Sequence, residues 1–126
     1  MIGKPAADAP GSCVEQIRAI LPVYFADPRA PYADDIGAMT CAAGINEATL
    51  GQIDDFDLRP ELAQLHVPAL AIVGEVDPFG TEWARETAAA IPGAKLLVVP
   101  KAGHFPWVEQ GEAFFAALDE LFRGAK

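Results

Sequence analysis

An aspartate and a histidine stand at matching positions after two apolar runs of this 126-residue chain. Asp77 lies in the loop Gly74–Pro78, directly after the run 69–73, and His104 lies in the loop Ala102–Pro106, shortly after the run 95–99. An imidazole accepts and returns a proton near neutral pH. A carboxylate bonded to its other ring nitrogen fixes the tautomer and stabilises the imidazolium. The two residues therefore have the chemistry of the acid and base of a hydrolytic triad.

Strands and helices that can carry these two loops are indicated by the hydrophobic pattern. Residues 69–74 are apolar without alternation, as in a strand covered on both faces, and residues 95–99 predict a second such strand. Between them, residues 81–91 predict a helix with Thr81 as its N-cap. A final amphipathic helix is expected over 108–122, with a buried side formed by Phe114, Phe115, Leu118, Leu121 and Phe122. This strand-helix-strand-helix order predicts an α/β fold with parallel strands.

The order has a geometric consequence for Asp77 and His104. Neighbouring parallel strands lie about 4.8 Å apart, and the loops after their carboxyl ends leave the same edge of the sheet. We therefore expect the two side chains to meet. Gly103 is expected to let the backbone turn sharply before the histidine, and Phe105 to shield the ring from water. The alternative is that Asp77 only caps a turn while His104 only ends a loop.

The sequence before residue 57 has a helical character instead. Residues 1–12 are expected to form a flexible lead-in, and residues 13–56 a helical region. Apolar residues recur at three- and four-residue steps over 14–25, and Pro22 should divide that helix. Further helices are predicted at 33–43 and 46–53. Residues 57–126 are expected to form the α/β segment, beginning with a short helix or turn at 59–65.

Composition excludes several classes of partner and site. Nine basic against eighteen acidic residues give a net charge of −9, which disfavours nucleic acid and anionic membranes. The residues Cys13, Cys41, His66 and His104 lack the spacing of a zinc set, so we predict no metal site. We expect no signal peptide, because no apolar stretch follows the first charge. A reduced, cytoplasmic location is therefore predicted.

Residues 57–123 resemble the C-terminal part of the α/β-hydrolase family. The stretches Asp57–Leu62 and Val67–Asp77 are similar to the segment that carries the triad acid of that family. Ile91–Leu96 and Ala102–Glu109 are similar to the segment that carries its histidine. Residues 14–55 resemble the helical cap, and Leu21–Pro28 is similar to the proline iminopeptidase-like branch.

The resemblance implies a serine hydrolase in which Asp77 orients the base His104. It also implies a small ester, amide or short-peptide substrate that enters beneath the cap. Phe105 and Trp107, in and beside the histidine loop, are candidate substrate contacts, and packing is the alternative role of Trp107. No metal or organic cofactor is implied.

One part of the family pattern is missing from this chain. Those enzymes carry their nucleophile on a Gly-x-Ser-x-Gly turn after a strand. The single serine, Ser12, and the adjacent Cys13 follow no strand, and the final glycine of the pattern is replaced by Glu15. We therefore predict no nucleophile in this chain and little activity without the half that bears one.

The alternative hypothesis is a non-catalytic α/β remnant that serves as a binding or interaction domain. A sheet of two strands has exposed edges. Both hypotheses therefore predict self-association or a partner. For the hydrolase, that partner is a complementing N-terminal hydrolase half.

Overall fold

The computed structural model describes residues 13–29, 49 and 57–124. These belong to two compact units. In the first, α1 (Cys13–Ile20) is followed by the 3₁₀ helix η1 (Leu21–Tyr24), whose last residue already belongs to the second unit. The α-helix ends two residues before Pro22, as predicted, because a proline disfavours helical geometry in the residue before it. The expected lead-in 1–12, the helix 33–43 and, apart from Thr49, the helix 46–53 lie outside the described residues.

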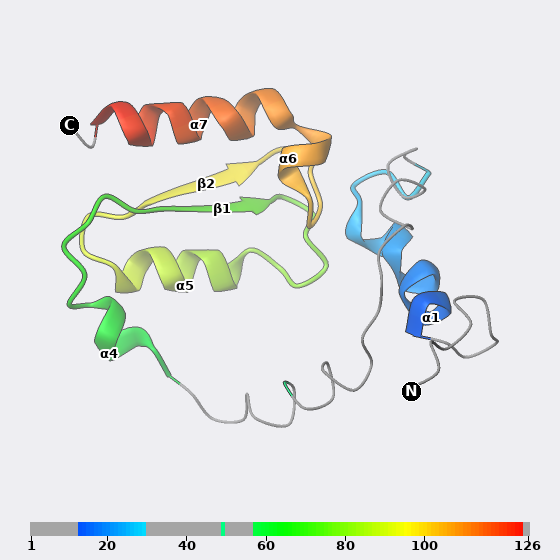
Figure 1. Ribbon diagram of the computed structural model, residues 1–126, viewed down its shortest axis with the longest axis horizontal. Coiled ribbons are helices and arrows are strands. Elements are labelled where there is room, and N and C mark those ends of the chain that lie inside the picture. Colours follow the sequence, from blue (N-terminus) through cyan, green and yellow to red (C-terminus); the bar gives the residue numbers. More distant parts are fainter. Residues whose placement is uncertain (1–12, 30–48, 50–56, 125–126) are drawn as a thin grey trace, which may run out of the picture. The chain divides into compact units, whose positions relative to one another are not determined.

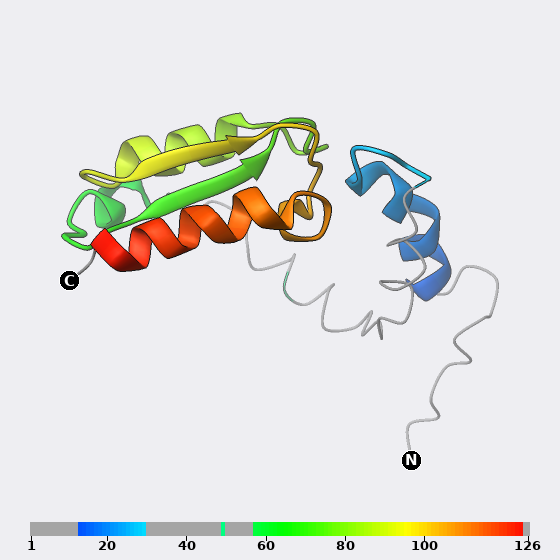
Figure 2. The ribbon, with the colours of Figure 1, turned by 90° about the horizontal axis from the view of Figure 1, so that it is seen from above.

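The second unit comprises residues 24–26 and the segment from residue 57 onward. Its elements are α4 (Arg59–Leu62), β1 (Leu70–Gly74), α5 (Glu82–Ala90), β2 (Lys95–Val99), α6 (Pro106–Glu109) and α7 (Gly111–Gly124). The strands pair in parallel, in a register that runs from Leu70 opposite Lys95 to Gly74 opposite Val99. Both strands point the same way, and α5 and α7 cover opposite faces of the sheet (Figures 1 and 2). The predicted α/β unit with parallel strands is therefore confirmed.

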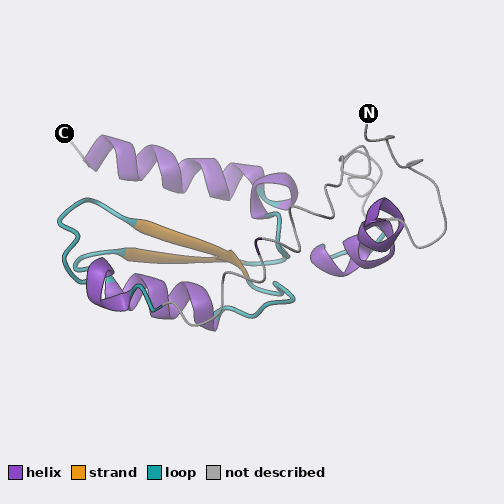
Figure 3. Ribbon diagram, turned by 60° about the horizontal axis from the view of Figure 1, so that its bottom comes forward, coloured by secondary structure: helices purple, strands orange, loops and turns teal. Residues whose placement is uncertain are grey.

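Burial in this unit increases toward the carboxyl ends of the strands. Val73 and Val99 are buried there, as is Ala102 in the following loop, whereas Lys95 at the start of β2 is exposed. Leu70 at the start of β1 is only half-buried. The sheet is thus best buried at the end where the Asp77 and His104 loops follow the strands. Figure 3 shows the loops that leave the two strands.

The final helix differs from the prediction of one continuous element. It is divided at Gln110, whose φ of −136° and ψ of 49° lie outside the helical region. α6 consequently lies beside the histidine loop, whereas α7 runs back along the sheet (Figure 1). Two residues predicted on the buried side, Phe115 and Phe122, are 55% and 67% exposed. The periodicity identifies an apolar stripe, but two strands offer too narrow a surface to cover all of it.

Thr81 occupies the predicted N-cap position of α5 without acting as a cap through its side chain. Its hydroxyl makes no hydrogen bond to the first turn, and its backbone is already helical, with φ −88° and ψ −11°. A capping side chain needs an extended backbone to reach back to the free N–H groups. The start of the helix was therefore predicted correctly, but the helix is not capped by the Thr81 hydroxyl as predicted.

Glycine is required at the last position of β1. A Cβ on Gly74 would overlap the backbone carbonyl oxygens of Ala102 and Gly103. Backbone atoms cannot move aside as the end of a flexible side chain can. The sheet therefore continues into its two loops only because this position lacks a side chain.

We predict that Gly74→Ala destabilises the chain by about 2–3 kcal/mol, as overpacking at a fixed contact does. Gly111→Ala is the matched control, because a Cβ there would meet only the Phe115 ring at ordinary contact distances of 3.7–3.8 Å. Urea unfolding of both variants measures the difference. Equal stabilities would show that the two loops do not approach as closely as described.

Candidate functional site

The two loops that leave the sheet are hydrogen-bonded to each other. Beyond the paired strands, Glu75 N–H donates to the Val99 carbonyl at 2.9 Å, and Val76 N–H donates to the Ala102 carbonyl at 3.1 Å. The Glu75 carboxylate also accepts the Lys101 N–H at 3.2 Å. Because two of these bonds link backbone to backbone and the third links a side chain to backbone, the Asp77 loop is fixed relative to the His104 loop.

Asp77 uses both oxygens of its carboxylate. Oδ1 accepts the N–H of Phe79 at 2.9 Å, which caps the turn after β1. Oδ2 lies 2.9 Å from Nδ1 of His104. The expected meeting of the two side chains is therefore observed, and Asp77 caps the turn as well. Its side chain is only 10% exposed, against 39% for the histidine.

The geometry assigns the two ring nitrogens different roles. An ionised carboxylate can only accept hydrogen bonds, so the nitrogen that faces Asp77 must carry the proton. The proton on Nδ1 leaves Nε2 of the neutral imidazole as the proton acceptor. In this arrangement the Asp77 carboxylate holds the Nδ1–H, and Nε2 can accept a proton from another group.

Aromatic rings surround the imidazole of His104 in edge-to-face contacts. The centroids of Tyr24, Phe79 and Phe105 lie 5.1, 5.1 and 5.3 Å from that of the histidine. Phe105 is thus beside the ring as expected, although the histidine is still partly accessible. Trp107, the other predicted substrate contact, is 46% exposed and packs edge-on against Phe105 at 5.6 Å.

Tyr24 and Phe79 were not singled out from the sequence. Phe79 follows Asp77 by two residues in the same turn, so its position could have been inferred from the loop. Tyr24 lies far from both loops in the sequence, and the apolar pattern around it is an ordinary helical one. Nothing in that pattern indicates that this residue reaches the histidine.

Gly103 allows a close approach of another segment, a role that the sequence did not predict. The left-handed backbone conformation in this loop belongs to Lys101, with φ 55°, and not to Gly103. The His104 N–H donates to the Tyr24 carbonyl at 2.7 Å. A Cβ on Gly103 would overlap that same carbonyl oxygen. Glycine is therefore required for close approach of the segment 24–26 to the histidine loop.

Comparison with known proteins identifies the family. Residues 4–117 match the Alpha/beta hydrolase family. The chain belongs to this family. The predicted fold class, part of an α/β-hydrolase fold with a parallel sheet between helices, is confirmed by the match and by the solved structures that the chain resembles.

Relatives of this α/β-hydrolase chain include two kinds of hydrolytic enzyme. A pimeloyl-[acyl-carrier protein] methyl ester esterase from Edwardsiella ictaluri is 32% identical over 90% of this chain and 40% of the esterase. A proline iminopeptidase from Lacticaseibacillus rhamnosus is 34% identical over 66% of this chain and 29% of the peptidase. The chain thus spans less than half the length of either enzyme. Resemblance to the proline iminopeptidases, inferred from the sequence, is confirmed.

Solved structures agree on the fold. The crystal structure of a bromoperoxidase from Bacillus anthracis matches 90% of this chain and 45% of its own with a TM-score of 0.74. Sequence identity is 20%, so this likeness concerns the fold alone.

The sequence contains candidate residues other than Asp77 and His104. His66 is exposed before β1. Cys13 begins α1, while Ser12 and Cys41 lie outside the described residues, which contain no serine. No group of three or more potential metal ligands occurs in the described ranges. Within those same ranges, no helix is both long and apolar enough to cross a membrane.

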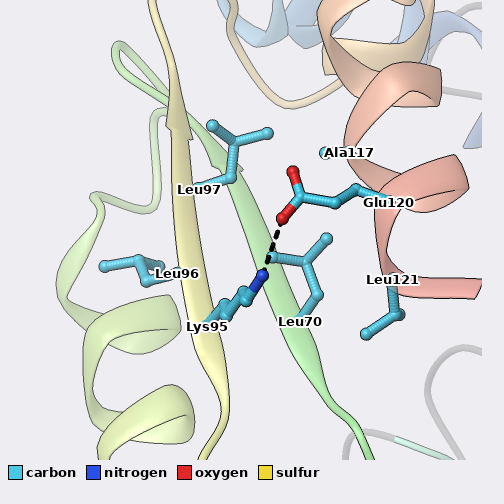
Figure 4. A pocket seen from close by; sticks show the side chains of 7 residues that line it. All are labelled: Leu70, Lys95, Leu96, Leu97, Ala117, Glu120 and Leu121. Atoms are coloured by element: carbon cyan, nitrogen blue, oxygen red, sulfur yellow. Dashed lines mark hydrogen bonds and ion pairs between the residues drawn. The ribbon is translucent and has the colours of Figure 1, made fainter. Parts of the chain in front are cut away.

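A surface pocket between the sheet and α7 is also separate from the pair. It lies at the amino ends of the strands, where Leu70, Leu97 and Leu121 line it (Figure 4). The ion pair of Lys95 Nζ with Glu120 Oε1, at 2.7 Å, crosses it and lowers the pKa of the glutamate. The contact between Asp77 and His104 lies beyond the opposite, carboxyl ends of the same strands.

We predict that the neutral imidazole of His104 carries its proton on Nδ1, and that Asp77→Asn removes this preference, because an amide donates as well as accepts. ¹⁵N chemical shifts of the ring nitrogens measure the tautomer. His66, which is exposed, serves as the internal control in the same spectrum. A tautomer unchanged by the substitution would mean that the carboxylate does not orient the ring.

Proposed function

We propose that this chain is the cap and C-terminal part of a serine hydrolase of the α/β-hydrolase family. Asp77 is the orienting acid, His104 is the general base, and the nucleophilic serine lies outside this chain. The observation that carries the proposal is the 2.9 Å contact between Asp77 Oδ2 and His104 Nδ1 at the carboxyl ends of parallel strands. Ligands of open α/β sheets bind at that edge.

The reaction follows from these roles. Nε2 of His104 takes the proton of the serine hydroxyl as its oxygen bonds to the substrate carbonyl carbon. The imidazolium, stabilised by Asp77, then gives that proton to the departing alcohol or amine, leaving an acyl-serine. Water attacks the acyl carbon while His104 again takes and returns a proton, which releases the acid and restores the serine.

The substrate that we propose is a small ester, amide or short peptide. Support comes from relatives that are named a methyl ester esterase and a proline iminopeptidase. The rings of Tyr24, Phe79 and Phe105 add apolar surface around the imidazole, which suits an apolar group beside the scissile bond. We further propose that residues 13–56 form the cap, that Phe105 and Trp107 contact substrate, and that the protein acts in the cytoplasm.

Completion of the enzyme requires a second polypeptide segment in this proposal. A two-stranded sheet leaves outer backbone groups available for further strands. Self-association or a complementing N-terminal hydrolase half would supply them. A non-catalytic binding domain is the alternative, and it is favoured by the lack of a serine among the described residues.

The decisive experiment is a chimera. The N-terminal part of the Edwardsiella esterase, up to the region that matches this chain, is joined in front of Met1. We expect this folded chimera to hydrolyse p-nitrophenyl esters and to react with a fluorophosphonate probe. His104→Ala should lower kcat about 10⁶-fold, as loss of a triad histidine does, whereas His66→Ala should leave it unchanged.

Three outcomes would overturn the proposal. A chimera that folds by circular dichroism but neither hydrolyses ester nor binds the probe would favour the non-catalytic domain. Activity that survives His104→Ala would exclude the histidine as the base. Labelling of the 126-residue chain alone, abolished by Ser12→Ala, would place the nucleophile within this chain.

A further inference from the structure

The carboxylate of Glu109 connects two segments that lie far apart in the sequence. Oε1 accepts the Ala26 N–H at 2.7 Å, across 83 positions of the chain. Oε2 accepts the Gly103 N–H at 2.6 Å. Both contacts are short, as hydrogen bonds to an ionised acceptor are. The side chain is half-buried at the last residue of α6, next to the histidine loop.

These contacts close a ring of hydrogen bonds around the backbone of His104. Glu109 binds Gly103 and Ala26, while the adjacent His104 N–H binds the Tyr24 carbonyl at 2.7 Å. The segment 24–26 is therefore held at both ends, once by the carboxylate and once by the histidine backbone. Two successive amides of the histidine loop are fixed by the same closed arrangement.

We infer that Glu109 is a positioning residue for His104 that acts through the backbone amides of Gly103 and Ala26. This inference rests on the proposed function, since it concerns the same base. Glu109 fixes the peptide planes before the histidine and thereby the direction of its Cα–Cβ bond. It also holds Tyr24, whose ring contacts the imidazole edge-on at 5.1 Å. That direction, together with the side-chain torsions of His104, determines how Nδ1 meets Asp77.

The chemistry of the contact requires a carboxylate. Both partners are N–H donors, so the side chain between them needs two acceptor atoms and no donor. Glutamate provides this, whereas glutamine has one acceptor oxygen and an NH₂ group that would face an N–H. Glu109→Gln keeps the shape of the side chain but must lose one of the two contacts. The change therefore separates charge and acceptor chemistry from packing.

The first test uses the 126-residue chain itself and needs no activity. We expect the amides of Ala26, Gly103 and His104 to be protected from hydrogen exchange to a similar degree, because one ring of bonds holds them. In the Glu109→Gln variant, at least one of these three amides should exchange faster. The ¹⁵N shifts of His104 should also show a weaker preference for a proton on Nδ1. Glu112→Gln, an exposed change at the start of α7, is the matched control and should alter neither. An unprotected Ala26 amide in the unsubstituted chain would overturn the inference without any variant.

The second test uses the hydrolase chimera. We expect Glu109→Gln to lower kcat by about 10- to 100-fold, the scale on which a small misplacement of a base acts, with KM changed less than twofold. Glu112→Gln should leave both unchanged. A lower melting temperature with unaltered kcat and His104 tautomer would show a purely structural contact and overturn the positioning role. An inactive unsubstituted chimera would count against the proposed function alone, because the first test reads the histidine directly.

Discussion

The close approach of two backbones at the end of the sheet is the constraint on which the site depends. Gly74 pairs with Val99, and its missing side chain leaves room for the Ala102 and Gly103 carbonyls. This contact allows backbone hydrogen bonds to continue from the strands into the loops. A wider separation would move Asp77 out of hydrogen-bonding reach of the histidine. The contact between Asp77 and His104 therefore depends on the sheet register as well as on the two side chains.

Much of this arrangement could be predicted from the sequence because it follows from topology. Two unalternating apolar runs separated by a helix require parallel strands, and parallel strands bring the following loops to one edge. Asp77 and His104 could be placed together on that basis. Family resemblance then added roles that the geometry permits. Their use in catalysis remains a prediction.

The contacts that the sequence did not reveal come from outside the strand-helix-strand pattern. Tyr24 binds the histidine loop, and Ala26 binds Glu109 across 83 positions of the chain. No periodicity encodes contacts between residues so far apart in the sequence. Glu109 looked like one polar residue of a continuous helix, yet its carboxylate binds two backbone amides and the helix breaks directly after it. Phe115 and Phe122 are exposed although they belong to the apolar stripe of the last helix. Such a stripe predicts which side of a helix faces the sheet, but not how wide the sheet is.

The gradient of burial along the strands bears on how the unit opens. Local unfolding begins where few apolar contacts hold the backbone. Here that is the amino end of the sheet, where Lys95 is exposed and Leu70 is half-buried, whereas Val99 and Ala102 are fully covered. Fraying of the sheet would thus proceed from the end remote from the histidine. Asp77 and His104 would keep their mutual geometry through such partial openings and lose it when the whole unit unfolds.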